Sequence, residues 1–99
     1  MEIIPVSKES FDKVLKLKDV IFDFWAPWCG PCRRVVPIVE EIALERSDIK
    51  VGKVNVDEQP ELAREFNVMS IPTLVVMKDG KIVNQSLGAK PKKQILAKL

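Results

Sequence analysis

The chain has two cysteines, Cys29 and Cys32, and only Gly30 and Pro31 separate them. Cysteines this close can serve a metal site, a structural disulfide or a redox-active dithiol. A closed zinc or iron–sulfur site takes about four ligands. Because the chain has no histidine and no third cysteine, such a site would need carboxylates or a second chain. A disulfide that closes so small a loop constrains the unfolded chain little. The spacing therefore favours a redox dithiol.

The elements around the pair predict different roles for the two sulfurs. Residues 20–25 are typical of a buried strand and the residues after the cysteines of a helix, so Cys29 falls at the junction and Cys32 one turn along. Unpaired N–H groups and the positive end of the helix dipole favour a thiolate there. We therefore expect Cys29 to attack a partner disulfide and form a mixed disulfide. Cys32 is then the resolving thiol that breaks it.

The rest of the chain predicts alternating strands and helices that hold this junction in place. Strands are expected at residues 2–6, 20–25, 49–56, 73–77 and 82–87, and helices at 7–17, from the cysteines to about 46, at 57–66 and at 90–99. Ser7 is expected to cap the first helix, and Asp79-Gly80 predicts a hairpin between the last two strands. Early alternation implies parallel crossovers, whereas the hairpin adds an antiparallel pair. The predicted fold is α/β, a central mixed sheet flanked by helices on both faces.

Length and composition limit the possible partners and locations. A chain of 99 residues that is 46% hydrophobic suits one domain, residues 1–99. A net charge of +2 gives no strong attraction to nucleic acid or anionic membranes. Residues 1–6 contain Glu2 and Pro5 and cannot form the apolar core of a signal peptide. The most apolar stretch, residues 20–28, is too short to span a bilayer. We therefore expect a cytoplasmic protein with no nucleic-acid or membrane partner.

Several segments together resemble the thioredoxin family. Residues 22–32, Phe-Asp-Phe-Trp-Ala-Pro-Trp-Cys-Gly-Pro-Cys, closely match the active-site segment of that family. Further matches occur in the family's order at Pro37, at residues 53–57 (Lys-Val-Asn-Val-Asp), at Ile71-Pro72-Thr73 and at Gly88-Ala89. The departures are modest: Pro27 occupies a variable position, and Met69-Ser70 precedes Ile71. The resemblance covers nearly the whole chain and implies a thioredoxin-like fold.

Two charged residues gain roles from this resemblance. A charged, unpaired carboxylate on a strand buried on both faces costs several kcal/mol, so the residues alone also allow Asp23 an exposed position on an edge strand. The resemblance implies instead a buried Asp23 beneath the cysteines, with a raised pKa, that accepts a proton from Cys32 directly or through a water. Without the resemblance, a lysine in a strand such as Lys53 is typical of a surface residue. The resemblance places it near Asp23 as a tuning charge.

A docking surface for client proteins is also implied by the resemblance. Pro72 matches a proline that is cis in the family, which would leave the Ile71 backbone free to pair with an extended client strand. Without the resemblance, Gly88 fits the interpretation of an ordinary turn glycine equally well. The implied apolar surface comprises Trp28, Gly30, Pro31, Ile71, Pro72, Gly88 and Ala89.

The expected activity is that of a protein-disulfide reductase. It would carry electrons from a thioredoxin reductase to disulfide-containing client proteins, as a monomer, with no bound cofactor or metal. A disulfide oxidant or isomerase would use the same atoms. A non-catalytic binding module on the same fold is the alternative from another class.

Overall fold

The computed structural model describes residues 3–15 and 19–99. Strands and helices alternate along the chain until the final hairpin, as the sequence predicts. In chain order they are β1 (Ile3–Pro5), α1 (Phe11–Leu15), β2 (Asp19–Trp25), α2 (Gly30–Glu45), β3 (Ile49–Asn55), α3 (Pro60–Glu65), β4 (Thr73–Lys78), β5 (Lys81–Leu87) and α4 (Lys92–Leu96).

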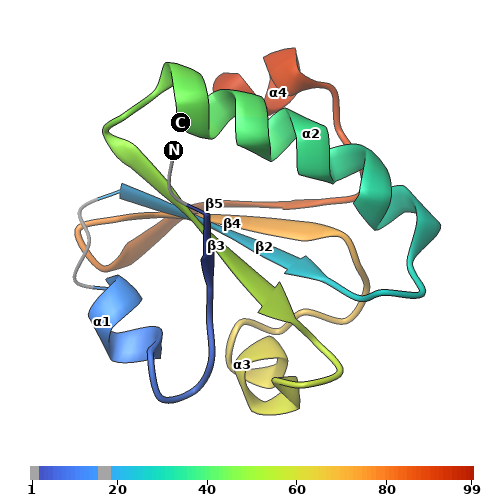
Figure 1. The fold of residues 1–99 in the computed structure, drawn as a ribbon. Helices are drawn as coiled ribbons and strands as arrows, with labels where there is room; N and C mark the ends of the chain where they lie inside the picture. The colour runs from blue at the N-terminus through green and yellow to red at the C-terminus, as the bar shows by residue number, and fades with distance from the viewer. Residues whose placement is uncertain (1–2, 16–18) are drawn as a thin grey trace.

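The strands form one mixed sheet in the order β1-β3-β2-β4-β5. β1, β3 and β2 are parallel, whereas β4 and β5 are antiparallel to their neighbours. Helices α2 and α4 cover one face and α1 and α3 the other (Figure 1). The predicted α/β fold, with a mixed sheet between two helical layers, is therefore confirmed. β2 is the central strand, and its carboxyl end leads directly to the cysteines.

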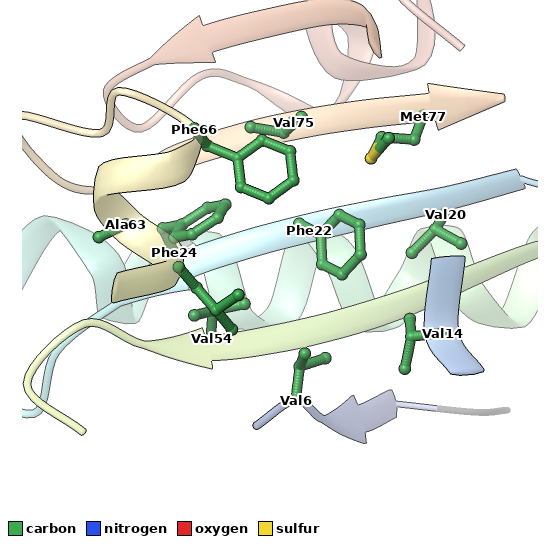
Figure 2. Close-up of a cluster of buried hydrophobic side chains, with 11 residues drawn as sticks. Val6, Val14, Val20, Phe22, Phe24, Val54, Ala63, Phe66, Val75 and Met77 are labelled. Carbon is green, nitrogen blue, oxygen red and sulfur yellow. The ribbon is translucent and has the colours of Figure 1, made fainter. Parts of the chain in front are cut away.

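Two hydrophobic cores lie on opposite faces of this sheet. On the α1 and α3 face, Phe22 and Phe24 of β2 pack with Phe11 and Phe66, with ring centroids 5.5–5.8 Å apart. Figure 2 shows Phe22, Phe24 and Phe66 within this cluster. The core beneath α2 and α4 is aliphatic and includes Ile21. Side chains alternate between faces along a strand. Asp23, two residues after Ile21, therefore lies on the α2 face.

Some predicted boundaries differ from the observed ones. α1 begins at Phe11, not directly after Ser7, because Ser7 and Ser10 form a turn in which each hydroxyl oxygen accepts the other's backbone N–H, at 3.0 and 3.2 Å. Ser10 then starts the helix, since its carbonyl accepts the N–H of Val14. The predicted end of this helix and the predicted strand start at Glu2 lie outside the described residues. The third helix begins at Pro60, and the last ends at Leu96.

The hairpin and the longest helix agree with the sequence more closely. β4 and β5 are joined by Asp79 and Gly80, whose φ angles of 52° and 78° are those of a two-residue type I′ turn. The longest helix, α2, has 16 residues. Within the described part of the chain, no helix combines the length and the apolar character needed to span a membrane.

Candidate active site

The two cysteines form a disulfide at the junction of β2 and α2, with their Cα atoms 5.3 Å apart. Cys29 is the N-cap of α2, and its Sγ accepts the backbone N–H of Cys32 at 3.2 Å. A donor placed at a helix start stabilises negative charge on that sulfur. Exposure hardly separates the two residues, at 4% for Cys29 and 2% for Cys32. The helix position, not the exposed fraction, distinguishes their chemistry.

Asp23 is completely buried, as the resemblance implied, and the alternative of an exposed edge position is wrong. It lies in the middle of the central strand, beside Lys53 of β3 and Leu74 of β4. Neither of its carboxyl oxygens has a hydrogen-bond partner among the described residues. Burial raises the pKa of the Asp23 carboxyl to about 6, and the positive charge of Lys53 opposes part of that rise.

Lys53 is mostly buried, with a side chain that is 19% exposed. Its Nζ lies 3.7 Å from Asp23 Oδ2 and 4.8 Å from the ring centroid of Trp25. The parallel register of β2 and β3 produces this pair, because it places the two residues side by side at the centre of the sheet. The ammonium therefore faces a carboxylate and an aromatic ring, both of which attract a cation.

A cavity of about 110 Å³ is lined by Cys32 and by Lys53 of the buried ion pair. Trp25 lines it as well. The Trp25 Nε1–H is buried without a hydrogen-bond partner in the described structure. This volume is large enough to admit water. Water in the cavity can therefore approach both Cys32 and the Lys53 end of the pair.

No three Cys, Asp or Glu side chains of the described residues are grouped so as to hold a metal ion.

Among the residues expected to bind clients, Ile71 packs against the small cluster that contains Cys29 and Cys32. The Ile71–Pro72 peptide bond is cis, as expected. Pro72 O accepts the N–H of Gly88 at 2.8 Å, and Gly88 has a φ of 91°, which favours glycine. The Ile71 N–H and C=O have no hydrogen-bond partner among the described residues. They are therefore available to an extended chain.

The remaining residues of the expected surface differ in their surroundings. Gly30 and Pro31 are exposed, and Trp28 is 69% exposed. Ala89 is half-buried and packs against the aliphatic core beneath α2 and α4. Ile71 likewise packs against buried clusters, and Pro72 is buried, so only part of the expected surface is open to solvent.

Sequence reasoning missed Asp57 and Met69. Asp57 Oδ2 accepts the indole N–H of Trp28 at 2.9 Å and so fixes the ring beside the disulfide. An acidic residue just after β3, next to the end of β2, was the available signal, since an indole N–H needs an acceptor. Met69 is 96% exposed close to Ile71. Its neighbours in the loop are Val68 and Ser70, so the local pattern did not mark Met69 as an exposed residue beside the site.

Comparisons with known proteins agree with this geometry. The family model described as Thioredoxin matches residues 2–99. The thioredoxin of Bacillus subtilis (strain 168) is 46% identical over 96 residues, which cover 96% of this chain and 92% of that protein. The bifunctional thioredoxin reductase/thioredoxin of Mycobacterium leprae is 48% identical over 99 residues, 97% of this chain and 22% of that protein.

A solved structure is also similar over most of its length. A mutant thioredoxin from Halobacterium salinarum, in which one asparagine is replaced by glutamine, has a TM-score of 0.88 and 36% sequence identity, and the match covers 95% of this chain and 84% of that one. Sequence, fold and the paired cysteines at the start of α2 all agree. The chain belongs to the thioredoxin family and is a thiol–disulfide oxidoreductase of the protein-disulfide reductase type.

Proposed function

We propose that Cys29 attacks client disulfides and that Cys32 resolves the resulting mixed disulfide. The Cys29 thiolate breaks the client S–S bond and bonds to one sulfur, while the other sulfur leaves as a thiolate. Cys32 then attacks Cys29, which releases the second client thiol and leaves the pair oxidised. Two electrons pass to the client. The hydrogen bond from the Cys32 N–H to Cys29 Sγ is the observation that carries this assignment.

Asp23 is the proposed base for the resolving step. A carboxyl with a pKa of about 6 is mostly ionised at neutral pH and can still accept a proton readily. The cavity between Cys32 and Lys53 provides room for a water that relays this proton. Lys53, 3.7 Å from the carboxylate, keeps the pKa of Asp23 from rising further. Lys53 is therefore a positioning and tuning residue, not a proton acceptor.

The exposed side of the disulfide is the proposed docking surface. An extended client segment would pair with the free backbone of Ile71, in a short form of β-augmentation. Its side chains would contact a surface drawn from Trp28, Gly30, Pro31, Gly88 and, at its margin, Ala89, while Pro72, the residue after Ile71, is buried and would shape the backbone there. The hydrogen bond to Asp57 holds the Trp28 ring in place for this contact.

The proposed setting is a cytoplasmic, monomeric domain of residues 1–99. A thioredoxin reductase is the proposed source of electrons, since one relative joins both activities in one protein. A monomer follows from the need to leave the disulfide face open to large clients. No cofactor is required, because the two thiols carry both electrons.

Single cysteine variants test the division of roles. With insulin as the disulfide client, Cys32→Ser is expected to accumulate a mixed disulfide through Cys29, detectable by mass spectrometry. Cys29→Ser should accumulate none, and both variants should lose turnover. A trapped adduct at Cys32 in Cys29→Ser, in equal yield, would reverse the assignment. Titration of the wild-type pair against a glutathione buffer separates the two directions of exchange, because a pair reduced readily by mild glutathione would be a disulfide oxidant.

A further inference from the structure

The small cavity of about 110 Å³ beside Cys32 has an inner and an outer side. Most of the residues that line it are buried or half-buried, including Cys32 and Lys53. Only Pro27 and Arg33 of its lining residues are exposed. These two residues therefore border the cavity where it approaches solvent. Cys32 is only 2% exposed, although its side chain lines the same space.

The two exposed lining residues are bonded to each other. Arg33 Nη2 donates a hydrogen bond to Pro27 O at 3.3 Å. This carbonyl cannot be used by the residue four positions later in the way a helix would use it, because that residue is Pro31, which has no N–H. The bond joins the loop before Cys29 to the first turn of α2, and both cysteines lie in the segment that it closes.

The position of Arg33 on α2 explains this reach. Side chains on a helix lean toward its N-terminus, so Arg33 extends over the turn that contains Cys32. Arg34 is also exposed and carries the same charge. Successive helix residues are about 100° apart around the axis, and Arg34 does not line the cavity. The two arginines therefore differ in where they point and not in their charge.

We propose that Arg33 is a positioning residue that covers the outer side of this cavity and shields the Cys32 thiol of the reduced protein from small reagents in solution. Attack by or on Cys32 is then confined to the side where Cys29 lies and the mixed disulfide forms. This proposal rests on the proposed function, in which Cys32 is the resolving thiol. Without the cover, a sulfur beside a cavity that admits water would be open to small electrophiles from a second side.

Alkylation of a single thiol tests this cover. In the Cys29→Ser protein, Cys32 is the only thiol, and its thiolate displaces iodide from iodoacetamide to form a stable S–C bond. The rate is measured by mass spectrometry across the pH range in which the thiol ionises, up to its plateau. Adding Arg33→Ala is expected to raise the plateau rate roughly three- to tenfold, as the loss of one hydrogen bond that holds the cover in place would give.

Three further substitutions in the same Cys29→Ser background separate the cover from general effects. Arg34→Ala removes the same charge from the next position and should leave the plateau rate unchanged. Arg33→Lys keeps a donor at the end of a long side chain and should retain most of the protection. Arg33→Met keeps an apolar stem without a donor and should behave like Arg33→Ala. All should unfold in urea near the midpoint of the parent protein, because both arginines are exposed.

The pH dependence distinguishes a cover from a charge. A cover changes the plateau rate, which the fully ionised thiol sets, whereas a nearby positive charge lowers the pKa of the thiol and moves the midpoint. Lys53 and its partner Asp23, the ion pair at this cavity, are the same in every variant. An unchanged plateau in Arg33→Ala, or an equal rise in Arg34→Ala, would overturn the proposal. The proposed function fails separately, if Cys29→Ser traps insulin at Cys32 as readily as Cys32→Ser traps it at Cys29.

Discussion

The buried Asp23–Lys53 pair at the centre of the sheet and the Arg46–Asp48 pair after α2 are both ion pairs, but their environments are opposite. Arg46 and Asp48 form two hydrogen bonds of 3.0 and 3.1 Å and lie at the surface. Asp23 and Lys53 are 3.7 Å apart, and the Asp23 oxygens have no hydrogen-bond partner in the described structure. The pair with the better geometry is the one that water screens.

The contrast explains why the buried pair is suited to chemistry. A carboxylate that accepts two good hydrogen bonds is held ionised, and the pKa of Asp48 is accordingly lowered by Arg46. Burial has the opposite effect on Asp23 and raises its pKa to about 6. A carboxyl that has no hydrogen bonds and a pKa near neutral pH can take up and release a proton in each catalytic cycle.

The largest expected effect of breaking the buried pair is on stability. Asp23→Asn removes a charge that costs free energy in the folded state at neutral pH. A pKa raised from 3.8 to about 6 corresponds to roughly 3 kcal/mol. Urea unfolding of the oxidised protein at pH 7 should therefore show the variant to be more stable by about that amount. Asp48→Asn, the matched change at the surface, should not raise stability. A destabilised Asp23→Asn protein would mean that the carboxylate is held by favourable interactions.

The same carboxyl predicts how stability depends on pH. The pKa of Asp23 is higher in the folded protein than the value near 4 of an unfolded aspartate, so protonation favours the folded state. Its stabilising contribution is complete below about pH 4 and is lost as the pH rises through about 6. The difference in unfolding free energy between Asp23→Asn and the wild type should therefore grow across this window. A constant difference from pH 4 to 7 would contradict a titrating Asp23.

The sequence predicted this site unevenly, for physical reasons. The spacing of Cys29 and Cys32 and the apolar run of the central strand are local patterns, so the junction could be read directly. The residues alone left Asp23 either buried or exposed on an edge strand, and the resemblance supplied its burial. The pairing of Asp23 with Lys53 depends on strand register, which no local pattern specifies. Only the resemblance supplied it. Asp57 and Met69 were missed because their contacts and exposure arise from loops that the fold brings beside the disulfide.

The boundary errors have a similar origin. Ser7 fits the preferences of a helix cap, but Ser10, three residues later, fits them equally well. The structure starts the helix after Ser10, because the two serines bond to each other's backbone across a turn. The Asp79-Gly80 hairpin needed no such long-range information. Its two positive φ angles are a property of those residue types.

A smaller effect is expected from the other partner of the buried pair. Lys53→Met keeps the apolar stem but removes the positive charge, so the pKa of Asp23 should rise further and less of the base is ionised at pH 7. Insulin reduction should slow by roughly two- to fivefold at pH 7 and recover at higher pH. Lys81→Met, at an exposed position on β5, is the matched control and should leave the profile unchanged. A uniform loss at every pH would indicate a structural role for Lys53.

The smallest effect is expected from the surface pair, although its hydrogen bonds are the better formed. Arg46→Ala removes both bonds to Asp48, but water solvates the two exposed groups in their absence. Arg46 also caps the end of α2 through its backbone N–H, which bonds to Ile42 O, and alanine retains that bond. The unfolding midpoint in urea and the rate of insulin reduction should both match the wild type. A marked loss of stability, removed by high salt, would show that Coulombic attraction at this surface matters as much as burial does at Asp23.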